Sequence, residues 1–189
     1  VNYLPPRYGD VPVAEVNNMV TLNVRTLLMM TRVVLPRMAT RRRSLIVNMS
    51  SSTSLCAHPM LQIYSSTKAF VRHFTDSIHA EYRGTVDVVA YTPWYVQTEM
   101  TKIREKAVYV VTPDEFVGCC VRFFGAASHC NPYWFHALMD IAVWFIPERV
   151  MSANIISQQT FVAKRLRMKR EAAAKAATEA PSDAAPASD

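Results

Sequence analysis

Two short apolar runs decide the fold: "SLIVNMS" at residues 44–50 and "VDVVAYT" at residues 86–92. Each has the length of a buried strand and ends in polar residues. Between them, residues 64–83 place apolar side chains on one helical face, and Gly84 follows, as is common after a helix C-terminus. Strand, long helix and strand form a βαβ crossover, which requires parallel strands and right-handed winding. The sequence therefore predicts an α/β fold.

Polar residues cluster where such a fold binds ligands, beyond the carboxyl ends of parallel strands. Three serines at residues 50–52 follow the first predicted strand, and "TPWYVQT" at residues 92–98 spans the end of the second. Tyr64 begins the connecting helix. An earlier helix, predicted from an apolar stripe between residues 16 and 34, carries Asn23. A buried asparagine bonds either to nearby backbone or to a water beneath an active site, and the sequence leaves both open.

The stretch "YSSTK" at residues 64–68 places Tyr64 and Lys68 one helical turn apart. Side chains at i and i+4 share a helix face, so the two groups can interact. A tyrosine beside a lysine is suited to proton donation, but the same spacing occurs by coincidence on any helix surface. The spacing alone leaves both interpretations open.

Composition places the chain among globular proteins with one substantial core. It has 189 residues, of which 50% are hydrophobic and 19% charged, and a formal net charge of +6. The positive charge gathers in residues 41–43 and 164–170, without interleaved aromatic residues or a recognised nucleic-acid motif. Such clusters suit an anionic membrane surface or a solvated face, and we expect no nucleic-acid partner.

The numbers and spacings of cysteine, histidine and glycine argue against disulfide, metal and phosphate-loop sites. The four cysteines form no C-x-x-C pair, which favours a reducing, cytosol-facing environment, and the five histidines lack ligand spacing, so we expect no metal. Only four glycines occur, and none belongs to a G-x-G-x-x-G phosphate loop. The chain begins without methionine in a Pro-rich loop, and we interpret it as a fragment.

The later segments predict further helices and a tail. Thr112, Pro113 and Glu115 form a capping box that opens a helix. Residues 133–147 are almost all apolar, apart from His136 and Asp140, and are too short to span a bilayer. We predict a domain over residues 1–163, followed at residues 164–189 by a basic helical stretch and a disordered Ala/Pro-rich tail.

Four motifs together resemble the short-chain dehydrogenases/reductases: "TLNV" at 21–24, "IVNMSS" at 46–51, "YSSTK" at 64–68 and "TPWYVQT" at 92–98. They stand in the family's order, with Ser51 thirteen positions before Tyr64. The sequence of residues 10–165 resembles that of one branch of the family, the very-long-chain 3-oxoacyl-CoA reductases and 17β-hydroxysteroid dehydrogenases. The resemblance implies the C-terminal part of a Rossmann-type, doubly wound parallel sheet that lacks the Gly-rich first βαβ half.

The resemblance also implies roles for four catalytic residues. Tyr64 would donate a proton to a ketone that receives hydride from a nicotinamide, and Ser51 would polarise the carbonyl. Lys68 would lower the pKa of Tyr64 and bind the nicotinamide ribose. Asn23 would position a water that connects Lys68 to solvent. NADPH is the expected cofactor, with NADH left open.

The segment after the second strand departs from the family pattern, because Trp94 stands where a glycine is usual. The resemblance places Pro93, Val96 and Thr98 against the nicotinamide amide, Val96 through its backbone. It also implies that Tyr64 and Lys68 bind the cofactor. Trp94 and Tyr95 would line the acyl channel, although packing alone explains two aromatic residues equally well. The phosphate-binding turn, the adenine-ribose selector and an N-terminal membrane anchor would precede residue 1, in about 100 residues of further βα units.

Three functions follow from these expectations. The first is NADPH-dependent reduction of a 3-oxoacyl-CoA in very-long-chain fatty-acid elongation, at the endoplasmic reticulum membrane with the active site facing the cytosol. The second is 17β-hydroxysteroid dehydrogenase activity, the reduction of a ketosteroid to a hydroxysteroid, or reduction of another lipid ketone, because fold and proton relay do not specify the carbon skeleton. The third is a catalytically inactive fragment that binds a membrane or a partner. A homodimer and elongation-complex partners are the further partners that the resemblance suggests.

Overall fold

A parallel three-stranded sheet lies at the centre of the computed structural model, which describes residues 7–99, 101, 103 and 107–179. Its strands run in the order β1 (Leu45–Met49), β2 (Asp87–Tyr91) and β5 (His129–Cys130). The β1–β2 register sets Leu45 opposite Asp87 and Met49 opposite Tyr91. A second parallel pair joins β3 (Tyr95–Val96) to β4 (Val110–Val111). The parallel β1–β2 pair, with a helix between its strands, confirms the predicted α/β fold.

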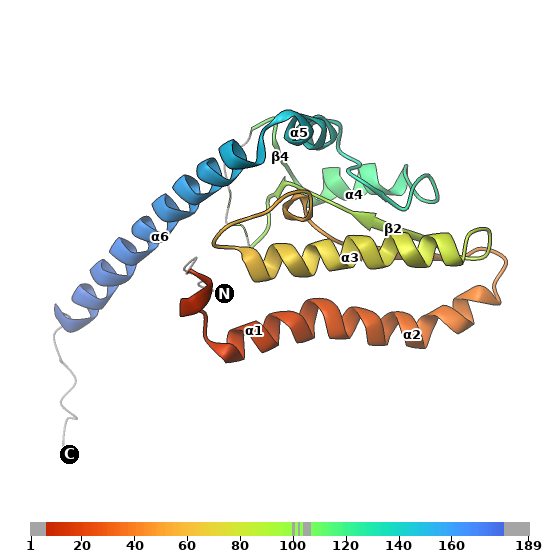
Figure 1. Cartoon of the computed structure of the whole chain (residues 1–189), viewed down its shortest axis with the longest axis horizontal. Helices are drawn as coiled ribbons and strands as arrows, with labels where there is room; N and C mark the ends of the chain where they lie inside the picture. The colour runs from red at the N-terminus through yellow and green to blue at the C-terminus, as the bar shows by residue number, and fades with distance from the viewer. Residues whose placement is uncertain (1–6, 100, 102, 104–106, 180–189) are drawn as a thin grey trace, which may run out of the picture.

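Helices cover the sheet on both faces (Figure 1). On one side lie α1 (Val13–Val20), α2 (Thr26–Ala39) and α3 (Gln62–Glu81), and α4 (Pro113–Val121) and α5 (Trp134–Phe145) lie on the other. The long α6 (Glu148–Glu179) projects away from these layers. Short 3-10 turns form at η1 (Tyr8–Asp10) and η3 (Ser52–Ser54).

Alternation along β2 builds a core on each side of the sheet. Val88 packs with Leu35 of α2, and its neighbour Val89 packs with Phe116 of α4. Successive strand residues point to opposite faces, and here both faces are covered, so β2 reads as a continuous apolar run. Each such fully buried side chain contributes about 1.5–3 kcal/mol. The carboxyl ends of β1 and β2 are thereby fixed side by side.

The predicted N-terminal helix forms, but with an irregularity in its middle. Between α1 and α2 the chain adopts a π turn, η2 (Thr21–Arg25), within one continuous helical run. The N–H and the hydroxyl of Thr26 both donate to the carbonyl of Thr21, the hydroxyl at 3.0 Å. Such turns occur mostly as single insertions in α-helices, frequently at functional sites. Asn23 lies inside this one.

The helix between the strands begins two residues before the predicted start, at Gln62, and ends at Glu81 rather than Arg83. Its C-cap is Tyr82, so Gly84 lies two residues beyond the cap instead of directly after it. Gly84 has φ of +84°, a left-handed conformation that other residues rarely adopt. The glycine is therefore required by the turn between α3 and β2.

The predicted capping box is confirmed at the start of α4. The Thr112 hydroxyl accepts from the Glu115 N–H at 3.3 Å, and the Glu115 carboxylate accepts from the Thr112 N–H at 3.0 Å. Downstream, α6 runs unbroken through residues 163 and 164, where the sequence predicted the end of the domain. Residues 180–189, the end of the predicted disordered tail, lie outside the described residues.

Within the described ranges, no helix combines the length and the apolar composition needed to cross a membrane.

Candidate active site

The loop after β1 and the first turn of α3 bring Ser51 and Tyr64 together. Ser51 is 8% exposed, and its side chain shares a hydrogen bond with the Tyr64 side chain. The Ser51 hydroxyl also accepts from the N–H of Thr53 at 3.2 Å, which fixes its position at the start of η3. The serine and the tyrosine, thirteen residues apart in sequence, therefore form one hydroxyl pair.

Two backbone hydrogen bonds attach this loop to the segment that follows β2. The N–H of Ser50 donates to the carbonyl of Tyr91 at 2.8 Å, and the N–H of Ser52 donates to that of Pro93 at 3.0 Å. Ser51 lies between these two anchors. The sheet edge thus holds the Ser51 loop against Tyr91 and Pro93, at the start of residues 92–98, as the parallel fold predicts.

The electrostatic environment of Tyr64 favours the protonated phenol. Burial raises the pKa of Tyr64 above its ordinary value, and the hydrogen bond with Ser51 lowers it by less. A phenol that keeps its proton at neutral pH can act as an acid. The lowering effect on the pKa of Tyr64 that the resemblance assigns to Lys68 stays a prediction, because the net shift of Tyr64 is upward and burial is its largest cause.

Lys68 is placed close to Tyr64, but it is directed at the backbone. Its Nζ donates to the carbonyl of Met49 at 2.9 Å and lies 5.7 Å from the centroid of the Tyr64 ring. Burial lowers the pKa of Lys68. The carbonyl of Lys68 accepts from the Ser50 hydroxyl at 2.7 Å, so this residue contacts the last residue of β1 and the residue that follows it.

Asn23 reaches the same helix from the π turn. Its Nδ2 donates to the Thr67 hydroxyl at 3.0 Å, and that hydroxyl donates to the carbonyl of Tyr64 at 2.8 Å. Thr67 is buried and lies between Tyr64 and Lys68 in sequence. Asn23 therefore contacts the catalytic helix through Thr67, a residue that the sequence analysis did not single out. Thr67 could have been found from its position in the sequence. It lies between Tyr64 and Lys68, where α3 faces the preceding helix.

Comparisons with known proteins agree with this geometry. The sequence profile described as short chain dehydrogenase matches residues 7–108. The chain belongs to the short-chain dehydrogenase family. Its relatives include the very-long-chain 3-oxoacyl-CoA reductase of Homo sapiens, 33% identical over 168 residues that cover 85% of this chain and 54% of that protein. Reductase-B of Danio rerio is 33% identical over 143 residues, covering 75% of this chain and 46% of that protein.

Solved structures confirm the fold of the family. The 3-ketoacyl-(acyl-carrier-protein) reductase from Brucella melitensis, complexed with NADH, superposes with a TM-score of 0.58 at 23% identity, over 69% of this chain and 59% of that one. A 7beta-hydroxysteroid dehydrogenase gives the same TM-score of 0.58 at 23% identity, over 67% of this chain and 52% of that one. The chain spans about half the length of the curated relatives it matches.

The donors that this short-chain dehydrogenase chain offers fit the nicotinamide side of a dinucleotide. An ammonium carries three N–H donors, and among the described residues Lys68 uses one of them, on Met49. The remaining donors and the Tyr64 hydroxyl match a pair of ribose hydroxyls in chemistry. These residues do not supply a Gly-rich phosphate-binding loop, because the chain has four glycines and no Gly-rich turn. The residues present fit one end of the cofactor.

The segment expected to meet the nicotinamide amide lies beside this donor set. The carbonyl of Pro93 bonds to Ser52, and that of Val96 accepts from the Thr101 hydroxyl at 2.7 Å. Thr98 and Thr101 bond to each other through N–H and hydroxyl groups at 3.0–3.3 Å. The structure therefore places Pro93, Val96 and Thr98 along one segment that contains β3, and their contact with a cofactor stays a prediction.

Trp94 and Tyr95 begin an aromatic cluster at the same edge. The Trp94 ring lies 6.5 Å from that of Tyr95, which lies 6.0 Å from the ring of Tyr109. Trp94 Nε1 donates to an Asp140 carboxylate oxygen at 2.6 Å. Asp140 was visible in the sequence as the one acidic residue of an apolar helix, but its partner, 46 residues away, was not predictable.

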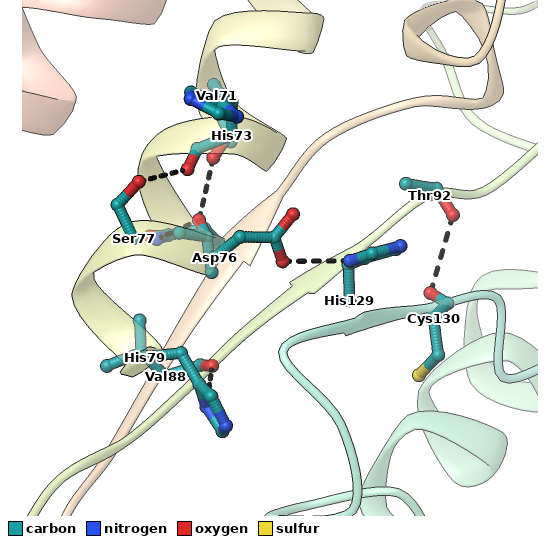
Figure 2. Close-up of polar contacts among 11 residues, drawn as sticks. Val71, His73, Asp76, Ser77, His79, Val88, Thr92, His129 and Cys130 are labelled. Carbon is teal, nitrogen blue, oxygen red and sulfur yellow. Dashed lines mark hydrogen bonds and ion pairs between the residues drawn. The ribbon is translucent and has the colours of Figure 1, made fainter. Parts of the chain in front are cut away.

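A second polar cluster lies farther along α3, where the helix faces β5 (Figure 2). His129 Nδ1 and an Asp76 oxygen are 2.8 Å apart, and both side chains are partly exposed. Burial raises the pKa of Asp76, but hydrogen bonds with Ser128 and His129 and nearby positive charge outweigh it, so the net shift is downward. The described residues hold no group of three or more His, Cys, Asp or Glu that could bind a metal ion. We interpret this pair as a structural link between α3 and β5.

Proposed function

We propose that this chain forms the catalytic side of an enzyme that reduces a lipid ketone with a nicotinamide cofactor, converting a 3-oxoacyl-CoA to a 3-hydroxyacyl-CoA. The observation that carries the proposal is the hydrogen-bonded Ser51–Tyr64 pair with Lys68 beside it. Family membership supports the reaction class, and the relatives' names support the acyl-CoA substrate. Reduction of this kind belongs to the elongation of very long fatty acids.

In this proposal the bound nicotinamide supplies the hydride for the carbonyl carbon. Ser51 donates a hydrogen bond to the carbonyl oxygen, where negative charge develops. Tyr64, kept protonated by burial, donates its proton to the same oxygen. The ammonium of Lys68 then stabilises the phenolate. Asn23 fixes α3 at Thr67 and positions the water through which Lys68 exchanges protons with solvent.

The cofactor and the substrate are tested together. The full-length enzyme is assayed with a long-chain 3-oxoacyl-CoA and with a ketosteroid, each with NADPH and with NADH. We expect turnover of the acyl-CoA with NADPH, with Lys68 and the segment that contains Pro93, Val96 and Thr98 holding the nicotinamide half. Preferential turnover of the steroid would replace the substrate class and leave the proton relay intact. Absence of turnover on every ketone would make the chain a non-catalytic binding protein.

We also propose that the apolar side of α5 rests on the cytosolic leaflet of the endoplasmic reticulum membrane. Trp144 and Phe145 are 81% and 82% exposed, and Trp134 is exposed at the other end of the helix. Aromatic residues at both ends of an apolar helix suit the headgroup boundary. The exposed cations Lys164, Arg165 and Arg167 follow on α6. A long acyl chain could then pass from lipid to the active site without crossing water.

The placement is tested by flotation of the full-length enzyme with vesicles that contain anionic lipid. Each basic residue near an anionic leaflet contributes roughly 1 kcal/mol, so neutralising Lys164, Arg165, Arg167, Lys169 and Arg170 together should release the protein at lower salt. Neutralising Arg41, Arg42 and Arg43, which follow α2 in the sequence, is the matched control. If release needs the same salt concentration in all three proteins, the electrostatic part of this proposal is wrong.

A further inference from the structure

Three consecutive residues beside the active site are each held by a different element. The carbonyl of Thr92 accepts from Asn131 Nδ2 at 2.6 Å, and the carbonyl of Pro93 accepts from the N–H of Ser52 at 3.0 Å. The indole of Trp94 donates to Asp140 at 2.6 Å. The hydroxyl of Thr92 also contacts the carbonyl of Cys130 (Figure 2), and the N–H of Thr92 donates to the same carbonyl. Trp94 is therefore fixed relative to Ser52, the residue next to Ser51.

Asp140 is an unexpected residue at its position on α5. Burial raises its pKa, and the hydrogen bond with Trp94 opposes that rise. A half-buried carboxylate costs free energy to desolvate, and an apolar residue would suit the rest of this helix better. Asn131 Nδ2 lies 3.5 Å from the same carboxylate oxygen, so the indole at 2.6 Å is the closer donor. The side chain of Asp140 is thus directed at Trp94.

The same side of α5 holds a second aromatic residue in place. His136, one turn before Asp140, is 0% exposed, and its Nε2 donates to the carbonyl of Tyr109 at 3.0 Å. Residues at i and i+4 lie on one helix face. The ring of Tyr95 contacts both the ring of Trp94 and the ring of Tyr109. α5 therefore anchors both flanks of an aromatic wall made of Trp94, Tyr95 and Tyr109.

We propose that Asp140 is a positioning residue for substrate selection: its hydrogen bond to Trp94 fixes the aromatic wall that the ketone substrate contacts beside Ser51 and Tyr64. The proposal rests on the proposed function, since it assigns this wall to the substrate of that reaction. A tryptophan at the position where the family usually has glycine occupies space next to the site. Its orientation then decides how much room the substrate has, and Asp140 sets that orientation.

The hydrogen bond is tested from both sides in the full-length enzyme. Asp140→Leu removes the acceptor and Trp94→Phe removes the donor, while Asp140→Asn keeps an acceptor oxygen and is the matched control. We expect each of the first two to raise the KM for a long-chain 3-oxoacyl-CoA about tenfold, the size of one lost charge-assisted hydrogen bond. For Asp140→Leu, which leaves every substrate-lining side chain in place, the kcat and the KM for NADPH should stay within about twofold, because Ser51, Tyr64 and Lys68 are untouched.

The double variant decides whether the two residues act as one unit. Trp94→Phe/Asp140→Leu should raise KM no further than either single change, because the same interaction is lost in all three. Multiplicative effects, or an Asp140→Leu enzyme with wild-type KM, would overturn the proposal. So would an Asp140→Asn enzyme that is as impaired as Asp140→Leu.

A readout that needs no turnover separates this proposal from the proposed function. In protein labelled with 15N-tryptophan, the indole N–H resonance of Trp94, assigned by its loss in Trp94→Phe, should shift in Asp140→Leu and stay near its place in Asp140→Asn. If the wild-type enzyme reduces no ketone, the proposed function fails, and this resonance still reports on the pair. A Trp94 resonance unchanged in Asp140→Leu overturns the positioning role in either case.

Discussion

The helices α3 and α5 both carry buried polar side chains, but they use them in different ways. On α3 the buried hydroxyls bond within the helix, as Thr67 does to the carbonyl of Tyr64 and Thr75 to that of Val71. On α5 the polar groups of His136 and Asp140 reach out to loops, while large apolar side chains face outward. The comparison indicates two different roles. The helix α3 holds the reacting groups rigidly, and α5 orients the surface that surrounds them.

The first and largest effect should come from α3. Tyr64→Phe removes only the hydroxyl, so the rate of ketone reduction should fall about 10²–10⁴-fold while NADPH still binds. Lys68→Ala should weaken both. Single-turnover kinetics and cofactor titration measure the two effects, and Tyr95→Phe is the control for loss of a phenol from the same site. Near-normal reduction by Tyr64→Phe would remove Tyr64 as the acid and α3 as the catalytic helix.

Replacing a buried hydroxyl of α3 tests its role as a frame. Thr75 is fully buried; its hydroxyl accepts from Asn48 Nδ2 at 2.9 Å and donates to the carbonyl of Val71. Thr75→Val leaves the Asn48 amide unpaired and should lower the free energy of unfolding by about 1–3 kcal/mol in urea titrations.

Ser77 on the same helix provides the control for Thr75. Its exposed hydroxyl donates to the carbonyl of His73 at 3.0 Å (Figure 2), so Ser77→Ala should leave the free energy of unfolding nearly unchanged. Equal losses of stability in Thr75→Val and Ser77→Ala would show that burial does not distinguish the hydroxyls of this helix.

The pH dependence of reduction tests the protonation of Tyr64. Burial raises its folded pKa above the ordinary value of 10.0, and reduction needs the protonated form. The rate should therefore stay level as pH rises from 7 to 9, and fall only above the ordinary value. Measured kcat at saturating substrate checks this, with Lys68→Arg as a variant that keeps a positive charge. A fall with an apparent pKa between 7 and 9 would show that Lys68 lowers the pKa of Tyr64 by more than burial raises it.

The smallest effect should come from the outer side of α5. Trp144 and Phe145 are almost fully exposed, so Trp144→Ser and Phe145→Ser should change the free energy of unfolding by no more than about 0.5 kcal/mol. Chemical unfolding of the lipid-free enzyme measures it, with Phe116→Ser, in the core under α4, as the buried control. A loss in the surface variants as large as that of Phe116→Ser would mean that this side of α5 is packed in the folded protein.

The features that the sequence predicted are those governed by local rules. Apolar runs of strand length, the Thr112 capping box and the βαβ order were all confirmed, because periodicity and hydrogen-bonding chemistry within a few residues determine them. The meeting of Ser51 with Tyr64 followed from parallel strands sharing one edge. Each of these inferences needed only the position of a residue along its own element.

The remaining features depend on distances in space. Nothing near Trp94 in sequence indicates Asp140 as its partner, and the direction of the Tyr64 pKa shift depends on burial rather than on the spacing to Lys68. The π turn at Thr21–Arg25 also went unpredicted, since one extra residue barely disturbs an apolar stripe read at three- and four-residue intervals.

The π turn also determines which insertions and deletions this gene can accept. A π turn takes up one additional residue, so losing one codon within residues 21–25 would restore ordinary α-helical bonding while α1 and α2 keep their present faces. Elsewhere in the helical run the same deletion would rotate everything before it by about 100° and break the apolar stripe. A one-residue deletion is therefore compatible with the fold at residues 21–25. The same deletion would remove the hydrogen bond from Asn23 to Thr67. Shortened variants of this helix should therefore fold normally and fail in the chemistry.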